Sequence, residues 1–455
     1  PAAIPRPRSA AVISNHSRMS YPLPLFVANL ATVRRMDNPC GRVISRTMEF
    51  DHDIAIIGSG LNGPALALAL SRAGLRVALI DALPAQRFED AAFDGRAYAL
   101  ALTSVRLMEG IGIWPEIADV AQPMLEIKVT DGRAGEGPSP MFMHFDHAEI
   151  EEGPMGHMVE DRHLRRALLD AVKADPAVTV LNETRVTAQT VAPTGITLTL
   201  DGGKTLRARL AVGADGRGSG TAERAGIKRI SWSYAQTALV CVVNHEKPHH
   251  GIAHQFFMPP GPLAILPLTG NRSLIVWSES TANAAAINAL PDAEYLEVLR
   301  PRFGSFLGDI SLTGARYSYP LGLSLAHSMT APRVALLGDA AHGVHPIAGQ
   351  GLNAGLRDVA ALAEVIADAV RRGEDPGNDA VLARYQEWRR FDNASLALAT
   401  DSFNRLFSND NALVRLARDV GMAAVNALPG LRRSFIREAA GLTGELPRLM
   451  QGKPL

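Results

Sequence analysis

The stretch at residues 53–82, DIAIIGSGLNGPALALALSRAGLRVALIDA, limits the fold more than any other part of the sequence. It contains an apolar run, a glycine-rich turn, a helical pattern, a second apolar run and a final acid (54–57, 58–63, 64–73, 77–80 and Asp81). Short apolar runs are typical of buried strands, and the proline and glycine at the two ends of the helical pattern mark a helix. The stretch therefore predicts a strand, turn, helix and parallel strand of an α/β domain.

The glycines of this turn have the spacing of a dinucleotide-binding turn. Gly58 permits the tight bend, Gly60 lets the backbone approach a pyrophosphate, and Gly63 lets the helix pack closely on the strand. The N-terminus of the helix offers free N–H groups and a partial charge of about +0.5 to the phosphates. Asp81 is placed to accept hydrogen bonds from ribose hydroxyls. The motif predicts dinucleotide binding and leaves FAD and NAD both open.

Two further apolar runs lead into aspartates. Residues 210–214 are followed by Asp215, and residues 333–337 are followed by Gly338 and Asp339. Open α/β sheets bind ligands beyond the carboxyl ends of their strands. We therefore expect both aspartates to lie near the glycine turn, at the same edge of one sheet.

Charge and cysteine content argue against several other classes of protein. Lysine plus arginine and aspartate plus glutamate number 46 each, so the net charge is zero, whereas nucleic-acid-binding proteins carry a basic excess. Two cysteines are too few for a disulfide framework or a zinc site, and HExxH and CxxC patterns are missing, so we expect no metal centre. No apolar run approaches the roughly 18–20 residues that a membrane-spanning helix needs.

The three motifs GSGLNG, GADGRGS and GDAAH together resemble the signature of the single-component flavin aromatic hydroxylases, the para-hydroxybenzoate hydroxylase class. HPIAGQGLNAGLRDV at 345–359 is similar, almost residue for residue, to the ubiquinone-biosynthesis hydroxylases of the 2-octaprenyl-6-methoxyphenol hydroxylase type. FDGRAYAL, VEDRHLRRALL and LFSNDNALVRLARDVG resemble the same family, at 93–100, 159–169 and 406–421. The resemblance covers about residues 50–450.

The resemblance implies an α/β fold: a Rossmann-like FAD-binding domain, an inserted antiparallel-sheet substrate domain and a C-terminal helical segment. We expect the FAD-binding domain in three parts, at 48–121, 161–230 and 331–400. The substrate domain is expected in two parts, at 122–160 and 231–330, and the C-terminal helices at 401–455. Within the substrate domain, residues 253–258 and 266–268 are our candidates for an apolar substrate pocket.

The resemblance also implies which residues bind FAD. The glycine turn of residues 58–63 would hold the pyrophosphate and Asp81 the adenosine ribose. Arg96 is similar to a family arginine beside the flavin. Asp215 would touch the pyrophosphate region, and Gly338 with Asp339 would bind the ribityl chain.

The stretch after Asp339 is expected to lie against the flavin ring. Gly349 and Gly351 would bring bare backbone against the flat ring, and Leu352 and Asn353 would offer backbone groups to its pyrimidine edge. The helix that follows would point its N-terminus at the ring and favour the anionic reduced flavin. The catalytic residues are unknown, and the candidates nearest the flavin are His345, Pro346 and Gly349. One departure from the family is Asp161, where its members often have Asn or Gln.

The resemblance implies an FAD-dependent monooxygenase that hydroxylates a polyprenylated phenol in ubiquinone biosynthesis. NAD(P)H would be the electron donor, O₂ the oxidant, and a flavin C4a-hydroperoxide the oxygen-transferring species. The alternatives are a flavoprotein reductase or oxidase acting on another hydrophobic substrate, and a flavin scaffold without turnover in a quinone-biosynthesis complex. Other enzymes of quinone biosynthesis are the expected protein partners. The sequence leaves the ring position, the prenyl length and the oligomeric state open.

The two ends of the chain differ from its middle. Residues 1–47 hold seven arginines and no sustained periodicity, and we interpret them as a disordered or non-native extension, with a transit peptide as the alternative. Near the other end, Arg432, Arg433 and Arg437 alternate with apolar residues, as in helices that lie on membranes. The alternative is a helix packed on the protein's own body. We expect a cytoplasmic protein, and a peripheral contact with the inner face of the cell membrane is a hypothesis.

Overall fold

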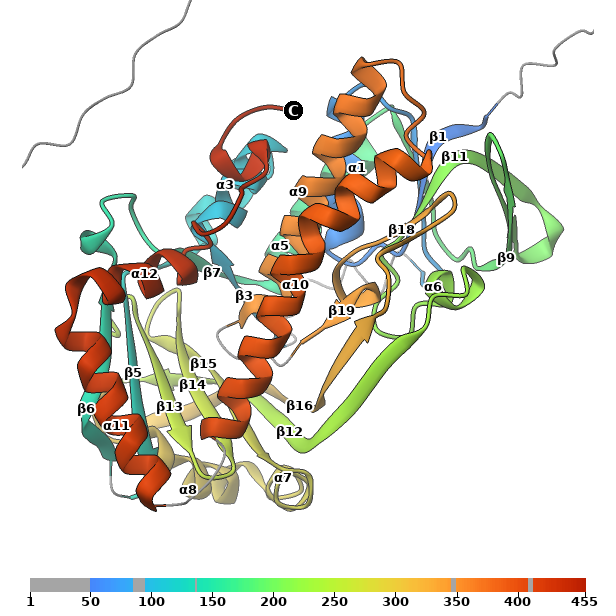
Figure 1. Ribbon diagram of the computed structural model, residues 1–455. Helices are drawn as coiled ribbons and strands as arrows, with labels where there is room; N and C mark the ends of the chain where they lie inside the picture. Colours follow the sequence, from blue (N-terminus) through green and yellow to red (C-terminus); the bar gives the residue numbers. More distant parts are fainter. Residues whose placement is uncertain (1–49, 85–94, 136, 345–348, 408–411) are drawn as a thin grey trace, which may run out of the picture. The chain divides into compact units, whose positions relative to one another are not determined.

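The computed structural model describes residues 50–84, 95–135, 137–344, 349–407 and 412–455. Residues 49–455 form one compact unit, and the strands among its described residues form three β-sheets (Figure 1). The interpretation of residues 1–47 lies outside the described residues. Within the described ranges, none of the helices combines the length and the hydropathy that crossing a bilayer requires.

The first sheet is built around the predicted strand–turn–helix–strand unit. Its strands follow the order β17-β18-β11-β1-β2-β8, and β9 and β10 extend it antiparallel beside β11. From β18 to β8 all neighbours are parallel. The strands are β1 (His52–Ile57), β2 (Val77–Ile80), β8 (Val178–Leu181), β9 (Val186–Ala192), β10 (Gly195–Leu200), β11 (Thr205–Gly213), β17 (Thr330–Ala331) and β18 (Val334–Leu336).

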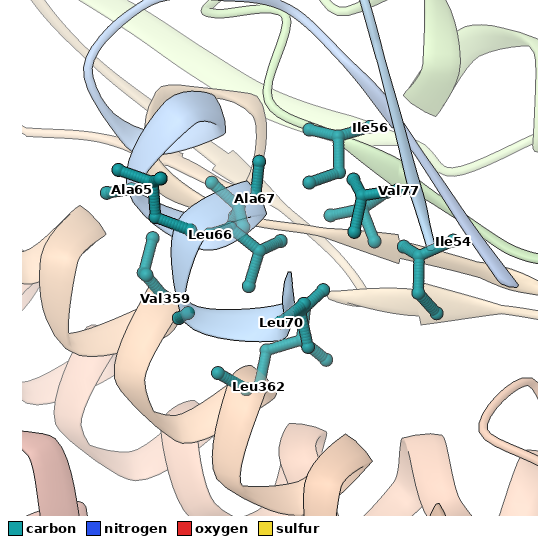
Figure 2. Close-up of a cluster of buried hydrophobic side chains, with 14 of the residues drawn as sticks. Ile54, Ile56, Ala65, Leu66, Ala67, Leu70, Val77, Val359 and Leu362 are labelled. Atoms are coloured by element: carbon teal, nitrogen blue, oxygen red, sulfur yellow. The ribbon is translucent and has the colours of Figure 1, made fainter. Parts of the chain in front are cut away.

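Helix α1 (Asn62–Arg72) is packed between this sheet and helix α9 (Gln350–Arg371). Figure 2 shows Leu66 and Leu70 of α1 between Ile54 of β1 and Leu362 of α9. These side chains are at most 2% exposed because α1 is covered on every side. That burial explains why the segment alternates alanine and leucine and has no polar face.

The second sheet has the order β19-β16-β12-β15-β14-β13-β5-β6. Its strands are β5 (Glu126–Arg133), β6 (Gly137–Asp146), β12 (Arg229–His245), β13 (Ile252–Met258), β14 (Gly261–Leu268), β15 (Arg272–Ser280), β16 (Ile310–Ala326) and β19 (His342–Gly343). Among the pairs of described strands, all are antiparallel except β13 with β5. That pair joins two segments that no hairpin connects, so nothing forces it to be antiparallel. A third, small sheet pairs β7 (Gly156–Glu160) with β3 (Ala97–Ala101) and β4 (Gln122–Met124).

The remaining helices cover the sheets (Figure 1). They are α3 (Leu102–Gly110), α4 (Trp114–Ile117), α5 (Asp161–Ala174), α6 (Gly220–Arg224), α7 (Thr281–Asn288), α8 (Asp292–Phe303), α10 (Asp379–Phe407), α11 (Ala412–Ala427) and α12 (Pro429–Ala439). Helices α11 and α12 contact β6, and α8 buries Tyr295 and Phe303 against the face of the second sheet that carries Phe256. The α/β fold class, with an inserted and mainly antiparallel sheet and helices at the C-terminal end, is confirmed.

The segment proposed to line a substrate pocket is divided between the two faces of the second sheet. Phe256 and Met258 pack with the residues of α8, and the ring of His254 lies 4.5 Å from that of Phe306, just after α8. Phe257 instead packs with Met422 and Ile436 of α11 and α12. Because side chains alternate along a strand, one apolar run serves two separate cores. The limits of the two domains stay a prediction.

Candidate cofactor-binding site

The predicted ligand-binding residues follow strands whose carboxyl ends are in register. The amide of Gly58 donates to the carbonyl of Ile80 at 2.8 Å, and the amide of Ala214 donates to that of Ile57 at 2.7 Å. The amide of Leu337 donates to the carbonyl of Gly213 at 3.1 Å. The chain therefore leaves β2, β1, β11 and β18 at neighbouring points on one edge, which places their loops together.

The three glycines of the turn have different surroundings. Gly58 has a φ of +110°, and a Cβ there would lie 2.4 Å from the carbonyl oxygen of Ala214. A Cβ on Gly63 would lie 2.0 Å from the carbonyl oxygen of Gly58, so this residue sets the close approach of α1 to the turn. A Cβ on Gly60 would meet nothing within 4 Å. The chain itself requires glycine at 58 and 63, whereas the space beside Gly60 is open to a ligand.

Asp81 caps the turn from the neighbouring strand. One carboxylate oxygen accepts hydrogen bonds from the amide and the hydroxyl of Ser59, at 2.6 and 2.7 Å, and the other accepts from the amide of Leu83 at 2.8 Å. These bonds fix the carboxylate beside the glycine turn. The oxygen that binds Ser59 already accepts two bonds, but the one that binds Leu83 accepts one and has a further lone pair, so contact with a ribose hydroxyl stays compatible with this geometry.

Asp215 is engaged mainly by its own loop. Its carboxylate accepts from the hydroxyl of Ser219 at 2.5 Å and from the amide and hydroxyl of Thr221, both at 2.9 Å. Such bonds hold the turn between β11 and α6. The predicted contact of Asp215 with the cofactor stays a prediction, and these bonds favour an indirect role through the shape of the turn.

Asp339 lies in a short turn that the rest of the chain fixes tightly. Arg229, from β12, donates to the backbone carbonyls of Asp339, at 3.0 Å, and of Ala340. Gly338 has a φ of +55°, and a Cβ there would strike the side-chain amide of Asn62 at 2.3 Å. The carboxylate of Asp339 is 44% exposed and lies 3.2 Å from Nε of Arg217. Its backbone is therefore held while its carboxylate is accessible to a ligand.

Arg96 is held by an ion pair with Asp161. Nη2 of Arg96 lies 3.2 Å from the carboxylate of Asp161, which is 3% exposed, and Arg165 binds both carboxylate oxygens at 2.8 and 2.9 Å. Burial, and then the charge of Asp161, raise the pKa of Tyr98 above its ordinary value. Asp161 therefore orients Arg96, whose side chain stays 42% exposed.

The first turn of α9 is tied to β3. Gly349 caps the helix with a φ of +65°, and a Cβ on it would lie 3.2 Å from that of Ala99. The side chain of Asn353 accepts from the amide of Ala101 at 2.9 Å and donates to the carbonyls of Ala99 and Gly349 at 2.8 and 3.1 Å. Only its backbone is left for the predicted flavin contact. His345 and Pro346 lie outside the described residues.

The residues at this edge fit FAD. Gly60 and Gly351 both have open space where a side chain would project, as bare backbone against a pyrophosphate and a flat ring requires. Asp81 and Asp339 present carboxylates that match the hydroxyls of a ribose and a ribityl chain. Each of these four residues therefore fits the part of FAD that the family resemblance assigns to it.

An apolar cluster lies beside the start of α9, and we call it the β3-facing cluster. It contains residues of the second sheet together with β3, β4 and β7 (Ala97, Ala99, Met124, Met158, Tyr234, Ala238, Val240, Val242, Leu266, Leu268, Leu274, Val276, Tyr317 and Leu321). Ala99 belongs to it and also neighbours Gly349, and a Cβ on Gly95 would meet the ring of Tyr317 at 2.4 Å. The start of α9, at Gly349, and the apolar face of the inserted sheet therefore meet at β3.

The histidines of the described residues give no sign of a metal centre. Among those residues, the structure contains no group of three or more His, Cys, Asp or Glu side chains arranged to hold a metal ion. His342, which follows the turn that carries Asp339, is 3% exposed and binds Asp358 through Nε2 at 2.5 Å. This contact indicates that His342 forms a structural hydrogen bond beside the candidate cofactor site rather than acting as a general base.

Comparison with known proteins identifies the class and then the family. Residues 51–396 match the FAD binding domain family. Ubiquinone hydroxylase UbiL of Rhodospirillum rubrum is 47% identical over 89% of this chain and 93% of that protein. The 3-demethoxyubiquinol 3-hydroxylase of Escherichia coli is 35% identical over 86% and 98%.

Among solved structures, p-nitrophenol 4-monooxygenase PnpA of Pseudomonas putida has a TM-score of 0.72 at 19% identity, over 88% of this chain and all of that one, which shows the shared fold. The chain thus belongs to the FAD-binding monooxygenase class. Within that class it is a member of the ubiquinone-biosynthesis hydroxylase family.

Several residues that shape the site were missed by sequence reasoning. Asn62 fills the space left by Gly338 and Gly355, Arg229 holds the Asp339 turn, and Asp358 lies behind it. Asn62 and Arg229 act through contacts distant in sequence, so no local pattern indicates them. Asp358 does leave a signal, because it is an acid on the buried face of an apolar helix.

The glycine turn yields a matched pair of substitutions. Gly60→Ala should leave the unfolding free energy within about 0.5 kcal/mol of wild type but weaken FAD binding roughly tenfold or more, because the methyl group projects into ligand space. Gly63→Ala should lower stability by about 1–3 kcal/mol, because it forces α1 away from Gly58. Denaturant titration of the apoprotein and FAD fluorescence titration measure the two effects. Unchanged FAD affinity in Gly60→Ala would contradict the assignment.

Proposed function

We propose that the chain hydroxylates the aromatic ring of a polyprenylated phenol in ubiquinone biosynthesis, with FAD as cofactor, NAD(P)H as electron donor and O₂ as oxidant. The family supports a phenolic substrate and molecular oxygen. The polyprenyl chain of the substrate is our inference from the activities of the relatives in ubiquinone biosynthesis and from the apolar character of the inserted sheet.

One observation carries the substrate class: the β3-facing cluster adjoins the start of α9. Its side chains are those of Ala, Val, Leu, Met and Tyr, and Val240, Leu266 and Leu274 belong to strands of the inserted sheet. The partly buried members of the cluster, among them Tyr234, Leu266 and Tyr317, are the ones that a hydrophobic ring or chain would contact. Such contact is favourable by about 25 cal/mol per Å² of apolar area removed from water. A small charged substrate would gain nothing from such contact.

The protein contributes binding, orientation and the exclusion of water. FAD, when bound, supplies the activation of O₂ that transfers one oxygen atom to an electron-rich ring. The glycine turn and Asp81 would hold its adenosine diphosphate part, and Asp339 its ribityl chain. Gly349, held against Ala99, would bring the ring next to the apolar cluster where the phenol binds. Apolar side chains around that place keep water away from the reacting atoms.

Deletion of the gene in the source organism is the direct test of the substrate. Lipid extracts of the deletion strain should accumulate a prenylated phenol or methoxyphenol, identified by mass spectrometry, because its ring is no longer hydroxylated. The wild-type gene should restore the quinone, and a gene that encodes Asp339→Ala should restore it poorly. A quinone profile unchanged by the deletion would contradict the proposal and point to another substrate.

We further propose a peripheral contact with the inner face of the cell membrane, where such a substrate would be found. Two of the arginines named for this role are engaged by the protein itself, since Arg432 pairs with Glu149 and Arg437 with Glu152. Leu428 and Leu431 are 55% and 44% exposed, and Arg433, which lies on α12 with Leu431, is exposed as well. These three side chains are the better candidates for contact with lipid.

Vesicle sedimentation tests this contact. Leu428→Ser combined with Leu431→Ser should reduce binding to vesicles of phosphatidylglycerol and phosphatidylethanolamine several-fold, because each leucine contributes apolar area to the interface. Leu398→Ser, on α10, replaces a 69% exposed leucine elsewhere and is the control. Equal binding by wild type and the double variant would remove the membrane contact from the proposal.

A further inference from the structure

Asp358 is a buried acid on α9 to which the cofactor assignments give no role. Its side chain is 0% exposed and its neighbours on the buried face of the helix, such as Val359 and Leu362, are apolar. A carboxylate in such a place is costly unless its charge is paired and its oxygens accept hydrogen bonds. Its contacts therefore show what it holds in place.

One oxygen of Asp358 binds both ends of the turn that carries Asp339. Oδ2 accepts a hydrogen bond from the amide of Gly338 at 3.0 Å and contacts Nε2 of His342 at 2.5 Å. Gly338 begins the turn, and His342 begins β19, which joins the second sheet beside β16. A single buried oxygen thus links the first and last residues of this five-residue segment.

The other oxygen anchors this carboxylate to α10. Oδ1 accepts from Nε of Arg389 at 2.8 Å and from the side-chain amide of Asn393 at 3.3 Å. Arg389 is 2% exposed, so the two charges neutralise each other out of water. Burial alone would raise the pKa of Asp358, but His342 and Arg389 outweigh it and hold that pKa below its ordinary value. The carboxylate of Asp358 is therefore charged, and its bonds to α10 hold it in place.

The opposite side of the turn is held by Arg229, which donates to the carbonyls of Asp339 and Ala340. The backbone of Asp339 is thus fixed between a buried carboxylate and a guanidinium group. Its own carboxylate is the exposed part of the turn, 3.2 Å from Arg217. Fixing a binding group before the ligand arrives lowers the entropy lost on binding.

We propose that Asp358 is a positioning residue for FAD: it fixes the Gly338–His342 turn so that Asp339 presents its carboxylate to the ribityl chain. This inference rests on the FAD site proposed above. It predicts that the charge of Asp358 contributes to FAD affinity although Asp358 lies behind the turn and does not itself touch the cofactor.

Titration of the apoprotein with FAD, followed by quenching of flavin fluorescence, tests the inference. Asp358→Asn should raise the Kd roughly tenfold or more, because an amide replaces one acceptor by a donor and removes the charge facing His342 and Arg389. Asp392→Asn is the matched control, since Asp392 pairs with the same Arg389 at 2.6 Å and otherwise with Arg357, which is not part of the turn. The control should stay within about twofold of wild type.

If circular dichroism shows that Asp358→Asn does not fold, two variants of His342 test the inference instead. His342→Leu removes the donor at the far end of the turn and should raise the Kd several-fold, whereas His342→Gln keeps an N–H donor and should recover most of the affinity. A merely structural role would lower the melting temperature of all these variants without changing the Kd of the folded protein. Wild-type affinity in Asp358→Asn, or in both His342 variants, would overturn the inference.

Asp339→Ala separates this inference from the site on which it rests. If Asp339→Ala binds FAD as wild type does, the cofactor assignment fails and the positioning role fails with it. If Asp339→Ala binds weakly while Asp358→Asn equals its control, only the positioning role fails. Weak binding by both, with the control unaffected, supports both.

Discussion

The structure depends on the register of four parallel strands. Because β2, β1, β11 and β18 end level with one another, three hydrogen bonds continue the sheet one residue beyond them, and the chain turns away at neighbouring points. Segments as distant in sequence as Gly58, Asp215 and Asp339 thereby share one edge. Slippage of any strand by one residue would point its side chains to the other face and move its loop. On one face of this sheet, α1 packs its apolar side chains between β1 and β2 on one side and α9 on the other (Figure 2).

Sequence reasoning identified the parts of the site that local geometry dictates. A tight turn needs glycine, so Gly58 and Gly63 could be read from spacing, and the structure gives each a contact that no side chain could share. The aspartates at strand ends could be found for a similar reason, because the ends of parallel strands are where ligands bind. The family resemblance supplied the remainder, including the choice of FAD over NAD.

The unpredicted parts are contacts between distant segments. Nothing near Asn62 in the sequence indicates that its side chain fills the gap between Gly338 and Gly355. Nor does the run at 253–258 reveal that alternate residues serve separate cores, since periodicity gives the alternation but not what covers each face. Asp358 was the readable exception: an acid among buried apolar positions requires buried partners, and Arg389 and His342 provide them.

The central claim is that this chain places one atom of molecular oxygen on a phenolic ring. The most direct measurement is turnover of the purified FAD-loaded protein with a short-chain prenylated phenol and NAD(P)H under ¹⁸O₂, with mass spectrometry of the product. The account predicts one labelled oxygen in a new ring hydroxyl and consumption of NAD(P)H that the phenol stimulates. Consumption of NAD(P)H with an unlabelled, reduced product would contradict it and indicate a reductase, and the absence of any turnover with bound FAD would indicate a scaffold.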